Sequence, residues 1–386
     1  MNQRKVCVVI TARPSYSRIR TALEAIRDHP HLKLQLVVAA SALLDRYGGT
    51  CAVIERDGFS IDRRVYMIVE GENPVTSAKS TGLGLAEMAT VFDDLKPDVV
   101  VTIADRFETM ATAVCAAYMN IPLVHVQGGE ITGSIDEKVR HAVTKLADLH
   151  FVSTTQAAER VRRMGERTDR VFVTGCPSID LAQEAIARPP ITFEKFFETY
   201  GGAGSEFDIS NGYIVVLQHP VTTEYQEARR HIEETLHAVH ASGLATLWFW
   251  PNVDAGSDGT SQGIRIFREH YDLPNVHFFR NLPPEVFVQT IYRSKCLVGN
   301  SSAGIRECSF LGVPAVNIGS RQDGRDRGGN VIDVGYDREE ILGAIHKQAA
   351  QGKFSEDALY GNGKAGEQIA ELLTSVPLTF EKKLTY

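Results

Sequence analysis

Short apolar runs without polar alternation recur along this chain, and most are followed by a polar turn and an amphipathic helix. Val99–Ile103 is the clearest run, and strands buried on both faces of a parallel sheet have this composition. The other runs that predict strands are Val6–Ile10, Leu34–Ala40, Val65–Val69, Pro122–Val126, Leu149–Val152, Val171–Thr174, Tyr213–Leu217, Leu247–Trp250, Val276–Phe279, Cys296–Val298 and Val313–Ile318. Strands that alternate with helices in this way predict an α/β fold built on parallel sheets.

One segment interrupts this alternation near the middle of the chain. Residues 189–211 contain Pro189-Pro190 and the run Gly201–Ser205, which is typical of a boundary between domains. We therefore expect a first domain over 1–188, a linker over 189–211 and a second domain over 212–365. A C-terminal helix and tail over 366–386 should pack back on the first domain.

Composition limits the function classes that the chain can belong to. The net charge of −7 and the short basic runs argue against a broad surface for nucleic acid or membrane. The six cysteines have no metal-ligand spacing, so we expect reduced thiols. There is no secretory leader pattern and no apolar run of about 18 residues. We expect a cytoplasmic protein.

The stretch from Leu297 to Glu307 has the pattern of an anion site. An apolar strand leads into Gly-Asn-Ser-Ser, and we expect a helix from about Ala303, capped by Ser302. Hydroxyls and free amides at a helix start favour a diphosphate, and Glu307 could reach a neighbouring ribose. An ordinary capped helix is the alternative interpretation.

Other strands also end in polar residues, at the edge where ligands bind to doubly wound sheets. Arg13 follows the first strand and could hold an anion, or could be a surface arginine. Asp105 follows Val99–Ile103 and could carry chemistry, or could cap the next helix. His219 is a candidate acid or base, or a structural histidine. Arg321 lies in a loop after the presumptive phosphate turn.

The segment after Pro122–Val126 adds further carboxylates. Gly128 and Gly129 would allow a ligand to approach the backbone, and Glu130 follows them. Asp136 lies in the next predicted helix, where a plain intrahelical pair with Arg140 is the alternative to a catalytic role.

Taken together, these motifs resemble the hydrolysing UDP-N-acetylglucosamine 2-epimerases over nearly the whole chain. The resemblance rests on Asp105–Glu108, Gly128–Glu130, Ser134–Ala142, Gln218–Val221, Pro251–Asp254, and Gly299–Glu307 with Arg321-Gln322. It implies two facing Rossmann-like domains of the glycosyltransferase-B architecture. It also implies a UDP-linked 2-acetamido sugar as substrate, no cofactor or metal, and a homodimer or homotetramer.

In that family, elimination of UDP takes the C2 proton, and water then adds to give a free ManNAc-type sugar for sialic-acid-type pathways. The residues that would act in catalysis are Asp105, Glu130, Asp136 and His219. The residues that would bind substrate are Arg13, Ser17, Arg106, Gln127, Asn252, Arg280, Ser301, Ser302, Glu307 and Arg321.

The chain departs from the family pattern at the start Ala12–Tyr16, which lacks the acidic residue expected near Ser15, and at Gln127. Gln127 stands where family members can carry a catalytic glutamate, and an amide cannot act as a base. The role of that glutamate could pass to Glu130, Asp136 or His219. Two alternatives to the hydrolysing reaction stay open: another nucleotide-sugar enzyme, such as a non-hydrolysing epimerase or a retaining glycosyltransferase, and a non-catalytic nucleotide-sugar sensor.

Overall fold

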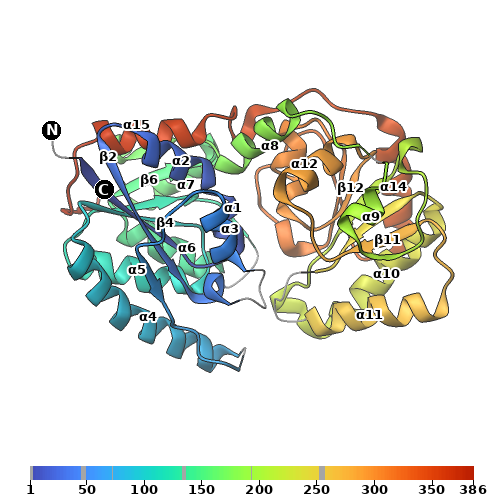
Figure 1. Cartoon of the computed structure of the whole chain (residues 1–386), viewed down its shortest axis with the longest axis horizontal. Coiled ribbons are helices and arrows are strands. Elements are labelled where there is room, and N and C mark those ends of the chain that lie inside the picture. Colours follow the sequence, from blue (N-terminus) through green and yellow to red (C-terminus); the bar gives the residue numbers. More distant parts are fainter. Residues whose placement is uncertain (1–2, 45–48, 72, 133–135, 193, 252–256) are drawn as a thin grey trace. The chain divides into compact units, whose positions relative to one another are not determined.

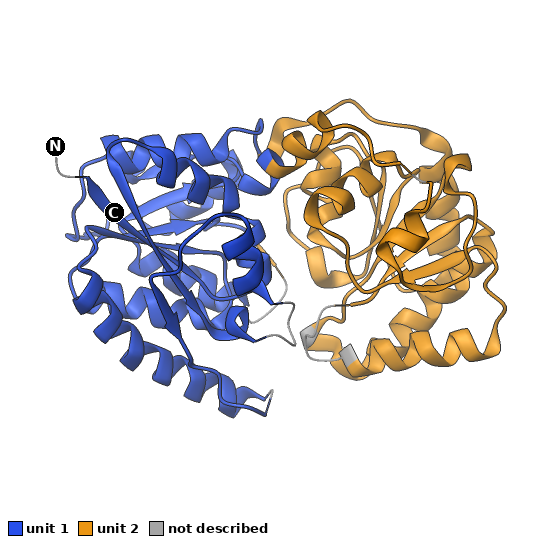
Figure 2. Ribbon diagram, in the orientation of Figure 1, with its two compact units in different colours: residues 1–130, 135–180, 361–386 blue, residues 131–134, 181–360 orange. Residues whose placement is uncertain are grey.

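A computed structural model describes residues 3–44, 49–71, 73–132, 136–192, 194–251 and 257–386 (Figure 1). They form two compact units (Figure 2). Unit 1 comprises residues 1–130, 135–180 and 361–386, and unit 2 comprises residues 131–134 and 181–360. The chain passes from unit 1 to unit 2 within helix α8 (Pro177–Ala187), and the predicted linker 189–211 lies in unit 2.

The described residues of unit 1 form a seven-stranded parallel sheet of order β3-β2-β1-β4-β5-β6-β7. Its strands are β1 (Arg4–Ile10), β2 (Leu32–Ala39), β3 (Arg63–Val65), β4 (Val99–Ile103), β5 (Leu123–Val126), β6 (Leu149–Val152) and β7 (Val171–Val173). The helices assigned wholly to unit 1 are α1 (Arg13–Ser17), α2 (Arg20–Asp28), α3 (Thr50–Arg56), α4 (Pro74–Leu95), α5 (Phe107–Tyr118), α6 (Asp136–Leu146), α7 (Thr155–Arg163) and α15 (Ala365–Ser375).

The described residues of unit 2 also form a seven-stranded sheet, of order β14-β13-β12-β9-β10-β11-β8, in which only β8 is antiparallel. Its strands are β8 (Ala203–Gly204), β9 (Ile214–Leu217), β10 (Thr246–Phe249), β11 (Val276–Phe279), β12 (Leu297–Gly299), β13 (Ala315–Ile318) and β14 (Val331–Val334). Its helices are α9 (Phe196–Tyr200), α10 (Ala228–Ser242), α11 (Ser257–His270), α12 (Pro284–Arg293), α13 (Glu307–Phe310) and α14 (Arg338–Gln351).

The non-alternating strands are apolar because each sheet is buried on both faces. Along β1, Val6, Val8 and Ile10 enter one core of unit 1, while Cys7 and Val9 enter the core on the opposite face. Burying one such aliphatic side chain contributes roughly 1.5–3 kcal/mol. The prediction of an α/β fold with parallel sheets is therefore confirmed.

The C-terminal helix packs on unit 1, as predicted. Helix α15 lies along α2 (Figure 1), and Gly366 allows the two backbones to meet at Thr21. The Asp180 carboxylate accepts hydrogen bonds from the Ala365 and Gly366 amides at 2.9 and 2.7 Å. These contacts satisfy amides that a helix start leaves without intrahelical partners.

The strand predictions need correction at three places. The run Val65–Val69 is mostly outside the sheet, because Ala39, the partner of Val65, is the last residue of β2. The sequence interpretation also omitted β14 and the short β8, which pairs with β11.

No helix within the described residues is both long enough and apolar enough to cross a bilayer.

Candidate active site

Strands β4 and β5 end side by side in unit 1, with Ile103 paired to Val126. The residues that follow them therefore share one edge of the sheet. Ala104 and Gln127 both adopt left-handed backbone conformations, with φ of +66° in each case. Such a conformation costs a non-glycine residue about 1–2 kcal/mol, and strain of this kind clusters at functional sites.

A buried arginine organises this edge. The Arg140 side chain is 1% exposed, donates one hydrogen bond to the Glu130 carbonyl oxygen at 2.8 Å, and forms an ion pair with the Asp105 carboxylate. Burial alone would lower the pKa of Arg140, but Asp105, Glu130 and Asp136 together raise it. The guanidinium is therefore charged, paired with Asp105 and within electrostatic reach of Glu130 and Asp136.

These contacts bear on the interpretations that the sequence left open. Arg106 is the N-cap residue of α5, and its side chain makes no capping hydrogen bond. The Asp105 carboxylate forms an ion pair with Arg140. Arg140 is also more than an intrahelical partner of Asp136, because it reaches from α6 to the end of β4.

A second layer supports the end of β4. His125 is fully buried, with Nε2 at 2.9 Å from the Ala104 carbonyl oxygen and Nδ1 at 3.1 Å from the Thr144 hydroxyl. Because a carbonyl only accepts, Nε2 carries the proton and Nδ1 accepts from Thr144. Burial lowers the pKa of His125 to about 3, which fits this neutral tautomer. His125 thus holds the carbonyl that precedes Asp105.

The two glycines predicted to admit a ligand instead admit other parts of unit 1. A Cβ on Gly128 would lie 2.9 Å from His125 Nδ1 and 3.0 Å from Thr144 Oγ1. A Cβ on Gly129 would lie 2.3 Å from the Ala157 carbonyl oxygen of α7. Their close approach is therefore to His125, Thr144 and α7.

Gln127 is buried. Its Nε2 donates to the Cys176 thiol at 3.0 Å, and its Oε1 has no partner among the described residues. Cys176 Sγ also lies 3.0 Å from the Ser178 hydroxyl. The Gln127 side chain is therefore anchored through its amide nitrogen, while its buried carbonyl oxygen is an acceptor that only a further donor would satisfy.

The remaining predicted residues of unit 1 have local contacts. Arg13 begins α1, and burial lowers its pKa. The Ser17 hydroxyl donates to the Arg13 carbonyl oxygen at 3.3 Å. Arg106 contacts Glu108 at 3.3 Å, and that carboxylate is 1% exposed. Each residue lies just after β1 or β4, at the carboxyl edge.

Unit 2 has an equivalent edge, where β9, β12 and β13 end in register. Asn300 follows β12, and its side chain binds the backbone of His219, which follows β9. The His219 amide donates to Asn300 Oδ1 at 2.7 Å, and Asn300 Nδ2 donates to the His219 carbonyl oxygen at 2.8 Å. This double contact fixes where the histidine leaves the sheet.

The backbone of Asn300 also binds the loop after β13. Its carbonyl oxygen accepts from Arg321 at 3.2 Å and from Gln322 Nε2 at 2.8 Å. Arg327 donates to the Gln322 carbonyl oxygen at 2.8 Å, which holds the loop closed. Asn300 therefore gathers the predicted residues His219 and Arg321 beside Ser301.

The segment after Asn300 differs from the predicted helix. The Ser301 hydroxyl oxygen, and not that of Ser302, accepts the capping hydrogen bond, from the Ala303 amide at 3.3 Å. A 3-10 turn (η6, Ser302–Gly304) leads to the four-residue α13. A Cβ on Gly304 would lie 3.2 Å from the Leu297 side chain, which would have to shift by a few tenths of an ångström to admit it.

Glu307 has one carboxylate oxygen, Oε2, that is buried and lacks a partner among the described residues. A buried acceptor of this kind is costly unless a donor satisfies it. A ribose hydroxyl pair would supply such donors, which agrees with the predicted role.

His219 is buried, and its pKa lies well below the usual value. Burial is the main cause of this shift, and the positive charge of Arg321 is the second cause. Its imidazole is therefore neutral at pH 7. A small pocket beside it is lined in part by His231 and Tyr336, whose rings stack 3.5 Å apart.

Arg280 is exposed directly after β11. Asn252 and residues 134–135 of the predicted motif lie outside the described residues.

The interpretation of the sequence did not identify three residues that organise the site. Arg140 had a signal, because it shares the buried face of α6 with Val143 and Thr144. Asn300 follows a strand directly but was treated only as part of a motif. His125 was taken as a strand residue, and its contacts depend on α6, which sequence spacing does not place.

Comparisons with known proteins agree with this description. The family profile described as UDP-N-acetylglucosamine 2-epimerase matches residues 24–374. The chain is 32% identical to a UDP-N,N'-diacetylbacillosamine 2-epimerase (hydrolyzing) of Legionella pneumophila, over 97% of each chain. It is 31% identical to a GDP/UDP-N,N'-diacetylbacillosamine 2-epimerase (hydrolyzing) of Campylobacter jejuni, over 86% of this chain and 85% of that one.

A solved structure shares the fold. It is that of a UDP-GlcNAc 2-epimerase from Neisseria meningitidis bound to UDP-GlcNAc, with a TM-score of 0.80 at 19% identity. The match covers 96% of this chain and 99% of the other. Two parallel-sheet α/β units of the glycosyltransferase-B type are therefore the architecture of this chain.

Proposed function

Because this chain belongs to the UDP-N-acetylglucosamine 2-epimerase family, we propose that it hydrolyses a UDP-linked 2-acetamido sugar with inversion at C2. The products would be UDP and a free ManNAc-type sugar. Support for the hydrolysing outcome comes from the two relatives above, which are named hydrolyzing and act on diacetylated sugars.

In the proposed reaction, a base removes the C2 proton while the bond between C1 and the UDP oxygen breaks, which leaves a glycal. Water then adds its oxygen to C1, and an acid returns a proton to C2 from the opposite face. The C2 proton is weakly acidic, so both steps require positioned acid and base groups. The departing diphosphate requires positive charge and fixed donors.

The observation that carries the proposal is the ion pair of charged Arg140 with Asp105, within electrostatic reach of Glu130 and Asp136 in unit 1. We assign the two proton transfers to Asp105 and Asp136, because carboxylates can both accept and donate a proton. Arg140 orients Asp105 and neutralises charge beside it. Glu130 is the alternative acid, since its backbone already anchors the arginine.

We assign the nucleotide to unit 2. Ser301, Ser302 and Arg321 would bind the diphosphate, and Glu307 would bind the ribose. His219 has a neutral ring, so it can donate one hydrogen bond to the leaving group without carrying a charge into it. Arg13 and Arg106 would add positive charge from unit 1, and Arg280 and Asn252 would bind the nucleotide or sugar.

A turnover experiment in deuterated water tests the proposal. The protein is incubated with UDP-GlcNAc or UDP-N,N'-diacetylbacillosamine, and products are followed by NMR. We expect equal amounts of UDP and a free sugar that carries deuterium at C2. A UDP-linked epimer with exchanged C2 would instead establish a non-hydrolysing epimerase, and release of unlabelled sugar would reject elimination.

The burial of Gln127 against Cys176 supports one further candidate, a sensor that binds nucleotide sugars without turnover. The same incubations distinguish it. Tight binding of UDP-GlcNAc, together with unchanged substrate and no deuterium uptake at C2, would favour the sensor over the enzyme.

A further inference from the structure

The C-terminal tail after α15 lies against the part of unit 1 that contains α6 and β6. Arg170 donates to the Pro377 carbonyl oxygen at 2.6 Å. Further along, Leu384 and Tyr386 lie over Gly165, where a Cβ would come within 2.7 Å of the tyrosine ring. The tail is therefore attached at several points, and Lys382 lies between them.

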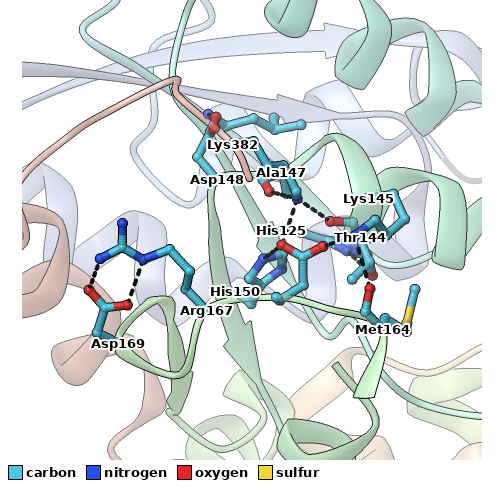
Figure 3. Close-up of polar contacts among 12 residues, drawn as sticks. His125, Thr144, Lys145, Ala147, Asp148, His150, Met164, Arg167, Asp169 and Lys382 are labelled. Atoms are coloured by element: carbon cyan, nitrogen blue, oxygen red, sulfur yellow. Dashed lines mark hydrogen bonds and ion pairs between the residues drawn. The ribbon is translucent and has the colours of Figure 1, made fainter. Parts of the chain in front are cut away.

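Lys382 binds the C-terminal end of α6. Its ammonium group donates to the carbonyl oxygens of Thr144, at 3.2 Å, and Ala147 (Figure 3). The last carbonyls of a helix lack intrahelical partners and carry the negative end of the helix dipole. A cation that donates to two carbonyls there fixes the position of the helix end.

A buried carboxylate holds the lysine in place. Glu166 is 5% exposed and contacts Lys382 at 2.7 Å, Lys145 of α6 at 2.6 Å and His150 of β6 at 3.0 Å. Although burial opposes the charged form, these three partners lower the pKa of Glu166 to about 2. The carboxylate thus joins the tail, α6 and the sheet.

Thr144 connects this cluster to the candidate active site. Its carbonyl oxygen accepts from Lys382, while its hydroxyl donates to His125, which in turn donates to the Ala104 carbonyl oxygen. Ala104 directly precedes Asp105. One turn before Thr144, Arg140 forms the ion pair with that same Asp105. Two routes therefore lead from the end of α6 to one catalytic carboxylate.

We propose that Lys382 is a positioning residue: by holding the end of α6, the C-terminal tail sets the placement of Arg140 and Asp105 for catalysis. This inference rests on the proposed function for its kinetic consequence. The residues assigned to the diphosphate and ribose in unit 2 are Ser301, Ser302, Arg321 and Glu307, whereas Lys382 and the tail belong to unit 1. Turnover should therefore depend on the tail, and nucleotide affinity should not.

The test compares Lys382→Met with Lys383→Met, because Lys383 is an exposed neighbour on the same tail. We expect kcat to fall about tenfold or more in Lys382→Met, since small misplacements of catalytic groups have effects of this size. KM and the Kd for UDP should stay within twofold of the wild-type values, because a twofold change in Kd corresponds to a free-energy difference smaller than RT. Lys382→Arg should recover part of kcat, and Lys383→Met should match the wild type.

A second variant keeps the test decisive if Lys382→Met is unstable. Thr144→Val removes the hydroxyl that binds His125 and leaves the carbonyl that binds Lys382. If the two side chains act through one network, the loss of kcat in the double variant will be smaller than the product of the single losses. Independent losses, or a lower Tm with unchanged kcat, would overturn the proposal.

Amide exchange separates this inference from the proposed function. In Lys382→Met, the amides of residues 140–147 and of 104–106 should exchange faster than in Lys383→Met, whether or not a substrate is known. If the wild type turns over no nucleotide sugar, the proposed function fails and exchange alone decides. Unchanged exchange in both segments would reject the positioning role even in an active enzyme.

Discussion

The Asn300 side chain binds both backbone groups of His219, accepting from its amide at 2.7 Å and donating to its carbonyl oxygen at 2.8 Å. The backbone of Asn300 also accepts from Arg321. This one residue therefore fixes a histidine, an arginine and the start of the serine turn.

We predict that Asn300→Asp weakens UDP binding at least about tenfold, because a carboxylate oxygen would face the His219 carbonyl oxygen in place of a donor. Isothermal titration with UDP measures the effect. Asn275→Asp is the matched control, since the Asn275 amide makes a single exposed hydrogen bond to the Gly243 carbonyl oxygen at 3.2 Å. Equal affinities for UDP in the two variants would refute the role of Asn300.

Arg140→Met should lower both turnover and stability. Removing the guanidinium leaves the Asp105 carboxylate, which is 16% exposed, without its ion-pair partner. Breaking one side of a buried pair costs about 3–5 kcal/mol. Urea denaturation and kcat measure the two effects, with Arg163→Met as the control because Arg163 is 78% exposed. Arg140→Lys keeps the charge, so it should recover more stability than turnover.

Glu307→Gln should reduce discrimination between UDP and 2'-deoxy-UDP. In the wild type, the buried Glu307 oxygen that lacks a partner among the described residues would accept from ribose hydroxyls. Hydrogen bonds to a charged group contribute about 1.5–3 kcal/mol. The preference for UDP should therefore fall about tenfold in competition binding. If the variant keeps the wild-type ratio, Glu307 does not bind the ribose.

Gln127→Ala should reduce kcat less than about tenfold, whereas Asp136→Asn should reduce it about a hundredfold or more. The reason is that the Gln127 amide donates to Cys176 and lies in the core. Steady-state kinetics compare the two variants. A larger loss in Gln127→Ala than in Asp136→Asn would show that the amide takes part directly in the reaction.

Acid should destabilise unit 1 through His125. Its folded pKa, about 3, lies below the ordinary value of 6.5, so the unfolded state binds the extra proton first. The stabilisation is complete above pH 6.5 and is lost as pH falls from 6.5 toward 3. One such group changes stability by about 1.4 kcal/mol per pH unit in that window.

Urea denaturation at several pH values tests this prediction. The free energy of unfolding should depend less steeply on pH between 6.5 and 5 in His125→Gln, by the contribution of about one proton, because glutamine does not titrate. Other histidines, among them His150 and His219, also have lowered pKa values and keep the remaining slope. An unchanged slope in His125→Gln would mean that His125 is protonated in the folded state.

The local pattern of the sequence was sufficient for most strands of the two sheets, although it missed β8 and β14. Val99–Ile103 and Val276–Phe279 were predicted to the residue, because non-alternating apolar runs have few other places to be buried. The same pattern failed for Val65–Val69. There, the length of the neighbouring strand β2 decides where the ladder ends, and no local signal reports it.

The sequence predicted which residues form the candidate site, but it did not predict which side chains contact one another there. Strand ends predicted that Asp105, Glu130 and His219 lie at the carboxyl edges of the sheets, because parallel strands share that edge. The register of the strands and the docking of α6 determine that Arg140 reaches Asp105, that His125 supports Ala104 and that Asn300 holds His219. The sequence therefore determined the sheets and their polar edges. Only the tertiary structure decided which side chains meet there, because those contacts join segments whose spacing is set by packing of the core.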